Sequence, residues 1–279
     1  MSLVSFSPNT LARSADVNAN FEYLEDLINA LVPSGVMLAY GGKTEPSSNW
    51  LFCYGQNVSR STYAALFDAI VPAVGTFTVT IATPGVFTLS SHGMQTGDQV
   101  YLTTTGALPT GLSANTLYYV IRTDANTFRL ATSRANAAAG TAIATSGSQS
   151  GVHTLRYCPH GLGDGSTTFG IPDARGRVLA GNDFLGGTAA SRLTLARSQG
   201  VYGNQGSVGG AESHVIVTAE LASHTHSLRI GNVSPGDGSG ARYSNNDTGN
   251  GVVQINTTGS DTAHNNVQPT LVENVIIKV

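Results

Sequence analysis

The chain has 279 residues, of which 41% are hydrophobic and only 11% are charged, and its mean hydropathy is +0.01. This composition indicates a folded protein, because long disordered chains combine low hydrophobicity with high net charge. A net charge of −3 and a pI near 6.1 provide no basic surface for nucleic acid or an anionic membrane, so we expect neither partner. With no secretory leader and no run of about 18 apolar residues, the sequence predicts a soluble protein made in the cytoplasm, without membrane insertion.

The first predicted element is a helix that ends before Pro33. Ser14 is a candidate N-cap, and Asp16 suits the positive end of the helix dipole. Apolar residues recur at alternating steps of four and three, as at the a and d positions of a coiled coil: Val17, Phe21, Leu24, Ile28 and Leu31. The pattern spans about two heptads, fewer than the three or four that identify a coiled coil, so an amphipathic helix packed on its own domain is an equal alternative.

From Val36 onward, short β-like runs alternate with turns rich in Gly, Pro, Asn and Asp. Residues 60–71 are a short helical exception, whereas 134–151 predict a loop with one edge strand. Residues 229–266 are so polar that they cannot bury enough apolar surface alone, so we expect them either to stay mobile or to be ordered by neighbouring chains. The predicted strands lie within 35–42, 50–56, 77–90, 98–106, 117–123 and 126–132.

Candidates for covalent chemistry are few. Cys53 and Cys158 could form one disulfide, but cytosolic thiols usually stay reduced, so their pairing is an open question. The glycine-rich run at 163–169 lacks the Lys and the helix of a phosphate-binding loop. Ser213 and His214 are neighbours on a strand and face opposite sides, so they cannot act as nucleophile and base. We therefore expect no catalytic residue and no enzyme, although three carboxylates remain formal candidates: Asp164, Asp173 and Asp183.

His224 and His226 lie two residues apart in a strand-like run. Side chains two apart on a strand share a face, with Cα atoms about 6.6 Å apart, so both imidazoles could point at one metal ion. Two ligands are too few to hold a metal. Either further ligands come from elsewhere, or the pair has no metal role.

Several ordered segments resemble one family. Residues 33–70 and 163–181 are similar to the phage tail collar domain. Residues 212–226 and 264–279 resemble the segments that follow this domain in phage tail fibres and in bacterial proteins of the microcystin-dependent type, and 9–24 resembles the entry segment of tail fibre proteins. The resemblance implies a mainly β protein with one N-terminal helix, built as an elongated, intertwined homotrimer whose collar domain carries an inserted small β module.

The resemblance also implies a domain organisation. Residues 1–32 would form a virion-attachment segment with a short coiled-coil helix. A discontinuous tail collar domain would comprise 33–75 and 158–187, interrupted by an inserted β module at 76–157, which is either a spacer or a second binding module. Residues 188–279 would form a metal-clamped C-terminal tip.

The run "IPDARGR" resembles the "LPDLRGR" element of collar domains, so the resemblance implies a structural role for its residues. Asp173 could pair with Arg175, since a planar guanidinium suits a carboxylate. The turn residues of interest are Pro172, Asp173, Arg175 and Arg177.

In similar fibres, H-x-H motifs meet around a threefold axis near the tip. The resemblance therefore implies that His224 and His226 from each of three chains provide six nitrogens for one transition metal. Structural zinc is almost always tetrahedral, whereas imidazole also suits iron, so an octahedral shell favours Fe²⁺ with Zn²⁺ as the competitor.

The function that the resemblance implies is a tail fibre or spike of the virion, a homotrimeric adhesin. Its N-terminus would bind a phage tail or baseplate protein, and its tip would contact a host surface glycan or an outer-membrane receptor, through residues such as Tyr243, Asn245 and Asn246. A purely structural collar, baseplate or neck component is the alternative, and a polysaccharide depolymerase ranks third.

Overall fold

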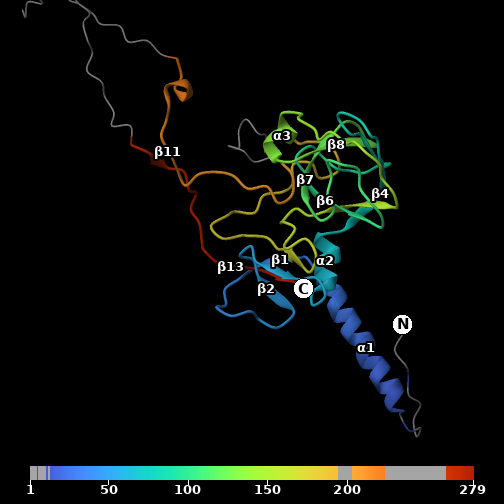
Figure 1. Cartoon of the computed structure of the whole chain (residues 1–279). Helices are drawn as coiled ribbons and strands as arrows, with labels where there is room; N and C mark the ends of the chain where they lie inside the picture. Colours follow the sequence, from blue (N-terminus) through green and yellow to red (C-terminus); the bar gives the residue numbers. More distant parts are fainter. Residues whose placement is uncertain (1–4, 6–10, 12, 194–202, 224–261) are drawn as a thin grey trace, which may run out of the picture. The chain divides into compact units, whose positions relative to one another are not determined.

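The computed structural model describes residues 5, 11, 13–193, 203–223 and 262–279, apart from the side chains of residues 28–30. It divides into two compact units, one comprising Met1–Gly210 with Leu271–Val279 and the other Ala211–Thr270. Strands predominate and helices are few in the described part of the chain (Figure 1). The prediction of a mainly β protein with an N-terminal helix is therefore confirmed.

Helix α1 spans Ser14–Leu31. Its N-cap is Arg13, whose carbonyl accepts hydrogen bonds from the amides of Asp16 (3.0 Å) and Val17 (3.1 Å). The prediction of Ser14 as the cap is thus wrong by one residue, because the first helical turn already closes on the carbonyl of Arg13. Asp16 keeps its predicted place in the first turn.

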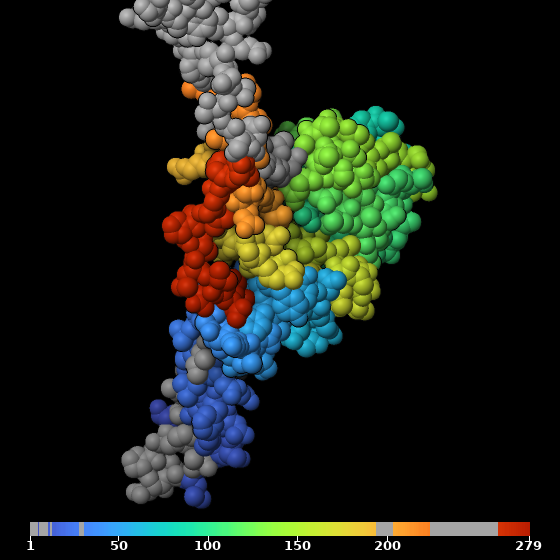
Figure 2. Space-filling view, turned by 90° about the vertical axis from the view of Figure 1, so that its left-hand side faces the viewer, coloured from blue at the N-terminus to red at the C-terminus, as the bar shows by residue number. Residues whose placement is uncertain are grey.

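The last strand of the chain forms the middle of a three-stranded sheet in the region that resembles a collar domain, here called the collar (residues 33–75, 158–187 and 271–279). Strand β13 (Asn274–Lys278) pairs antiparallel with β1 (Met37–Tyr40) on one side and with β2 (Trp50–Phe52) on the other. Figures 1 and 2 both show the red C-terminal residues against the blue collar residues. Ile276 and Ile277 point to opposite faces, and both are buried.

This position of β13 corrects the assignment of all of 188–279 to the tip. A strand whose two faces are both apolar needs cover on both sides, and a central place between two collar strands provides it. The last nine residues, Leu271–Val279, therefore belong to the same unit as the collar.

The rest of the collar connects distant parts of the sequence. Strand β3 (Asn57–Ser59) pairs with β10 (Thr168–Gly170), and helix α2 (Ala64–Ile70) lies within the predicted helical run 60–71. Tyr54 and Asp173 form an isolated bridge beside this pair. One apolar core joins these elements, and its largest buried members include Leu66, Phe169, Ile171 and Ile277.

A closed six-stranded barrel occupies the segment that the sequence set apart as an insertion. Its strand order is β4, β5, β8, β7, β6, β9. Buried and more exposed residues alternate along β7 and β8, which is the pattern of strands around a filled barrel core. The strands are β4 (Ala73–Val79), β5 (Phe87–Thr88), β6 (Gln99–Thr104), β7 (Leu117–Arg122), β8 (Thr127–Ala131) and β9 (His153–Tyr157).

Residues 134–151, predicted as a loop, begin with helix α3 (Arg134–Ala138). The Ser133 hydroxyl accepts a hydrogen bond from the amide of Asn136 at 3.1 Å and so caps the helix. The run of alanines that follows favours a helical turn. Helix α3 contacts β7 and β8, as Figure 1 shows.

The barrel joins the collar through two neighbouring strands, since β4 and β9 pair antiparallel and carry the two ends of the segment. Arg156 on β9 donates a hydrogen bond from Nη1 to the Val71 carbonyl at 2.9 Å, just after α2. The guanidinium groups of Arg60 and Arg156 both lie 5.0 Å from the centre of the Phe67 ring. Cation–π contacts of this kind stabilise by about 0.5–2 kcal/mol each, and the one made by Arg156 connects the barrel to the collar.

The unit Ala211–Thr270 contains two short paired strands, β11 (Ser213–His214) and β12 (His264–Asn265), and a 3₁₀ turn, η1 (Thr218–Glu220). The chain enters this unit through β11 and leaves it through β12, and these two strands are paired. The barrel is likewise entered and left through a pair of strands, β4 and β9. The pairing of β11 with β12 places His214 directly across from His264.

The thiols of Cys53 and Cys158 are both free and both belong to the collar core. Burial raises the pKa of Cys53 to about 11 and that of Cys158 to about 12. Both are therefore protonated, unreactive core residues at neutral pH.

The central strand can be tested by truncating one side chain. Ile277 is fully buried between Met37 and Leu51 on the neighbouring strands. Replacing it by Ala is expected to lower the free energy of unfolding by about 2–5 kcal/mol. Ile81→Ala, at a position that is 46% exposed, is the matched control and should cost less than about 0.5 kcal/mol. Urea unfolding of the two variants would measure both values, and equal values would contradict a central place for β13.

Candidate functional site

The predicted metal ligands and receptor contacts lie outside the described residues. This applies to His224, His226, Tyr243, Asn245 and Asn246. Among the residues that the structure does describe, no group of three or more His, Cys, Asp or Glu side chains is placed to hold a metal ion. The metal site therefore stays a prediction.

The collar turn that contains Pro172 is closed by one carboxylate. Asp173 accepts hydrogen bonds from Arg175 Nε at 2.9 Å and Nη2 at 3.0 Å, so a planar fork meets both of its oxygens. Arg177 adds a hydrogen bond from Nη1 to the Asp173 carbonyl oxygen at 2.7 Å. Arg175, followed by Arg177, holds the pKa of Asp173 below its usual range.

A glycine makes this turn fit the rest of the collar. Gly55 has a φ of +78°, and its amide donates a hydrogen bond to the Pro172 carbonyl at 3.1 Å. A Cβ atom at this position would lie 2.9 Å from the Cβ of Asp173. Both the backbone conformation and the close approach therefore require glycine. The turn connects two distant parts of the collar, and its acidic and basic groups are occupied by one another.

The histidine pair of the second unit has an acidic partner. His214 Nε2 lies 2.7 Å from Glu220 Oε2, and the His214 and His264 rings are 6.0 Å apart in an edge-on arrangement. Glu220 also accepts the amide of Val217 at 2.9 Å. This amide, followed by His214, holds the pKa of Glu220 below its usual range.

Two histidines without a sequence-derived role are structural. His92 Nδ1 accepts the amide of Met94 at 3.0 Å, its Nε2 lies 3.1 Å from the Asp124 carbonyl, and its ring packs edge-on against Phe128. His160 lies in the collar, where burial lowers its pKa to about 4.

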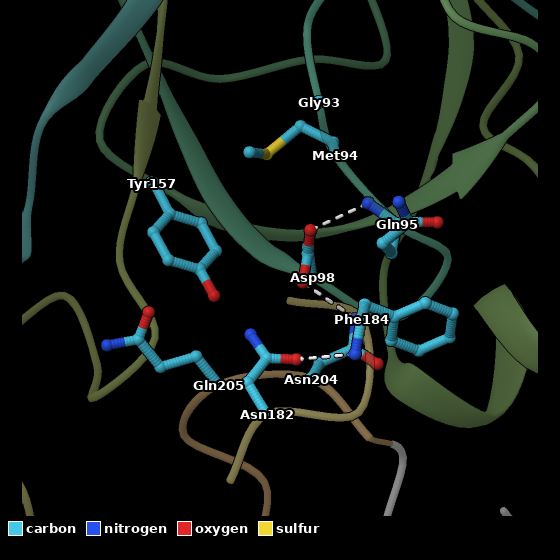
Figure 3. A pocket seen from close by; sticks show the side chains of 9 residues that line it. All are labelled: Gly93, Met94, Gln95, Asp98, Tyr157, Asn182, Phe184, Asn204 and Gln205. Atoms are coloured by element: carbon cyan, nitrogen blue, oxygen red, sulfur yellow. Dashed lines mark hydrogen bonds between the residues drawn. The ribbon is translucent and has the colours of Figure 1, made fainter. Parts of the chain in front are cut away.

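A cavity of about 190 Å³ lies between the barrel and the segment that follows the collar turn (Figure 3). Barrel residues form one side of it, and residues 182, 184, 204 and 205 form the other. The lining comprises Gly93, Met94, Gln95, Asp98, Tyr157, Asn182, Phe184, Asn204 and Gln205.

The floor of the cavity is a buried carboxylate, Asp98. Its two oxygens accept hydrogen bonds from the Gln95 amide at 2.7 Å and from Asn204 Nδ2 at 2.6 Å. Asn204 Nδ2 also donates to the Thr96 carbonyl at 3.2 Å, which fixes the orientation of the amide. Burial raises the pKa of Asp98, and these hydrogen bonds oppose the rise.

Two further polar groups at the cavity lack partners within the described part of the chain. The Asn204 side-chain oxygen is buried without a hydrogen bond, a state that costs about 1–3 kcal/mol. The hydroxyl of Tyr157 makes no hydrogen bond to a described residue, and burial, followed by the nearby Asp98, raises its pKa. A buried oxygen such as that of Asn204 calls for a water molecule or a ligand as its partner, and the Tyr157 hydroxyl is available to bind one.

Hydrogen bonds of Asp183 stabilise the side of the cavity that lies opposite the barrel. The Asp183 carboxylate accepts hydrogen bonds from the backbone amides of residues 191 and 192, both at 2.9 Å, and its own amide donates to the Gly203 carbonyl at 2.9 Å. Asp183 therefore folds the chain back on itself and brings Asn182, Phe184 and Asn204 to one place. The sequence contains no motif that marks Asp98 or Asn204, because the two residues are 106 positions apart.

Residues 35–77 match the family model of the Phage Tail Collar Domain. The matched segment contains β1, β2, β3, α2 and most of β4. The chain thus carries a phage tail collar domain, as the resemblance implied. This domain indicates a structural protein associated with the phage tail, and hence a component of the virion tail.

A comparison with curated proteins found no match to the chain. Within the described residues, no helix has the length and apolar character that a membrane span requires.

The low pKa of His160 predicts a pH dependence of stability. Unfolding restores an imidazole pKa of about 6.5, so the unfolded chain binds more protons than the folded chain between pH 6.5 and 4. Stability should therefore fall by about 1–3 kcal/mol as the pH drops through this window. A His160→Gln variant, which cannot titrate there, should lose part of this slope in chemical unfolding measured at each pH. His153, whose pKa is also lowered by burial, would supply the slope that remains, and an unchanged slope in the variant would contradict the assignment.

Proposed function

We propose that this protein is a homotrimeric tail fibre or spike of a bacteriophage, which binds the tail through its N-terminal segment and contacts the host surface through its C-terminal segment. The observation that carries the trimer is the apolar stripe of α1. Phe21, Leu24 and Leu31 occupy the predicted a and d positions and are 61%, 43% and 79% exposed. A helix whose coiled-coil positions face solvent in one chain is complete only when other copies cover them.

Further apolar side chains support assembly from several chains. Large exposed apolar residues lie on the collar and on the segments that flank the second unit, and apolar surface on this scale marks interfaces. They include Leu38, Val178, Leu179, Leu185, Leu271 and Val272.

The metal site is part of this proposal. His224 and His226 from three chains would surround one transition metal, Fe²⁺ in preference to Zn²⁺, because six imidazoles close an octahedral shell. The intervening polar segment 229–266 has too little apolar surface to pack by itself. Metal binding would then contribute to folding and assembly free energy and not to catalysis.

The proposed host contact rests on the side-chain chemistry of the polar segment 229–266. Asn, Tyr and Ser side chains such as Tyr243, Asn245 and Asn246 form hydrogen bonds with glycan hydroxyls, and three copies per fibre would strengthen weak contacts. The N-terminal segment 1–32 would bind the tail or baseplate protein.

A purely structural collar, baseplate or neck component is the alternative, since the collar domain alone is compatible with it. A depolymerase has less support. Each of the three candidate carboxylates accepts hydrogen bonds from its own turn or loop: Asp164 from the amide of Thr167, Asp173 from Arg175, and Asp183 from the backbone of residues 191–193.

The trimer can be tested at the helix. Replacing Phe21 and Leu24 by Ser removes two apolar side chains per chain from the proposed seam, and each contributes about 1.5–3 kcal/mol when buried. The trimer dissociation constant should rise at least about a hundredfold, while the fold of the collar stays intact by circular dichroism. The matched control replaces Glu22 and Asp26 by Ser, at positions outside the seam, and should stay trimeric in analytical ultracentrifugation. A wild-type chain that is monomeric would overturn the proposal.

The metal and the adhesin role share a second test. Native mass spectrometry with elemental analysis is expected to find one transition metal per three chains, and the His224→Ala, His226→Ala double variant should lose it. A His214→Ala variant, which removes the partner of Glu220, should keep the metal. Labelled wild-type protein should adsorb to cells in a panel of bacteria, and the double variant should not. A metal-containing trimer that adsorbs to no cell that supports the phage would favour the purely structural alternative.

A further inference from the structure

The cavity between the barrel and residues 182, 184, 204 and 205 has the form of an open binding pocket. Its floor, made by Gln95, Asp98 and Asn204, is buried, whereas Asn182 and Gln205 at its edge are exposed. A cavity of about 190 Å³ holds roughly six water molecules at about 30 Å³ each, and it is smaller than the roughly 300–1,000 Å³ of sites for drug-sized ligands. The space suits a ligand of one small ring.

The polar groups in the cavity suit hydroxyl groups. Figure 3 shows the heads of Tyr157, Asp98 and Asn182 directed toward the same space. Each Asp98 oxygen already accepts one hydrogen bond and has capacity for another, so the carboxylate can accept from ligand hydroxyls. Asn182 uses its oxygen for the Phe184 amide at 2.9 Å, which leaves its NH₂ group to donate. The Tyr157 hydroxyl can donate or accept.

The apolar part of the lining and the negative charge of Asp98 further narrow the class of ligand that the cavity can bind. Phe184 and Met94 offer apolar surface against which the C–H face of a ring can pack. None of the lining residues is Lys, Arg or His, and the one charged group is the Asp98 carboxylate. An anionic ligand would meet this carboxylate with no cationic side chain in the lining to offset the repulsion.

A cation is the less suitable occupant. Calcium takes six to eight oxygen ligands, usually with several carboxylates, but this lining contains one carboxylate. The Asn204 amide also turns its NH₂ group, not its oxygen, toward Asp98. The arrangement of donors and acceptors is that of a site for a neutral polar molecule.

We infer that this cavity binds one neutral sugar ring, at the free end of a glycan or as a free sugar. Asp98 accepts hydrogen bonds from ring hydroxyls, Tyr157 and Asn182 complete the polar contacts, and Phe184 packs on the ring. The site is distinct from the proposed tip contacts. Only the biological source of the sugar rests on the proposed function, since a host-binding fibre would meet it on a cell surface.

The test uses the full-length chain and a panel of methyl glycosides of neutral hexoses and N-acetylhexosamines, with glucuronic and sialic acids as the charged comparison. Saturation-transfer NMR identifies which compounds bind, and titration gives the dissociation constant. Binding of at least one neutral glycoside in the millimolar range is expected, with no binding of the acids. A glycan that ends in the same sugar would then be added as a competitor. Competition assigns the ligand to glycan ends, and its absence assigns it to free sugar.

Variants locate the binding to this cavity. Tyr157→Phe removes one hydroxyl that has no partner in the described structure, so it should preserve the fold and weaken binding about three- to tenfold. Tyr119→Phe, on the barrel but outside the cavity, is the matched control and should bind as wild type. Asp98→Asn should abolish binding, and thermal melting reports whether that variant folds.

Two results would overturn the inference: no neutral glycoside binds, or binding is equally strong in Tyr157→Phe and in wild type. Both are separable from the proposed function. A trimeric, metal-containing chain that adsorbs to cells but binds no glycoside would refute only the sugar site, and a monomer that binds a glycoside would refute only the trimer.

Discussion

The collar depends on one constraint: its central strand comes from the end of the chain. Strand β13 pairs with β1 and β2, although residues 53–273 separate it from β2 in the sequence. The entropy of closing such a loop grows only logarithmically with length, at about 0.6 kcal/mol for each doubling. A barrel and a further unit can therefore be added between the second and the last strand at small cost, provided that each leaves and re-enters at adjacent points. The barrel satisfies this condition through β4 and β9, and the second unit through β11 and β12.

The chain has few charged residues, and several of them form contacts between segments that are far apart in the sequence. Arg60 donates to the Thr168 carbonyl at 2.9 Å, across 108 residues, and Arg156 fastens the barrel to α2. Asp173 closes the collar turn, and Asp98 with Asn204 connects the barrel to the chain beyond the collar. A charge-assisted hydrogen bond is stronger than a neutral one, so a small number of such contacts fixes how long segments meet.

The features that could be predicted from sequence are those whose causes are local. The period of α1, the alternation of the barrel strands and the Asp173–Arg175 pair all depend on residues a few positions apart, and each is present in the structure. The central place of β13 and the cavity depend on residues one hundred or more positions apart, and no local pattern encodes them. Helix α3 lies between these cases, because its cap, Ser133, is visible in the sequence, but the following glycine- and serine-rich run favoured a loop.

The exposed stripe of α1 and the cavity are independent observations that would reinforce each other in one assembly. A single sugar ring offers few contacts, so a site of this size binds weakly by itself. A trimer would present three such cavities, one in each chain. Linked weak sites gain 10²- to 10⁴-fold in avidity when they bind at once. Trimerisation through a coiled coil at the N-terminal helix would thus explain how a chain with low charge and a small polar pocket could bind a cell surface. In that arrangement the barrel would act as a second binding module rather than as a spacer, the two roles that its position in the sequence left open.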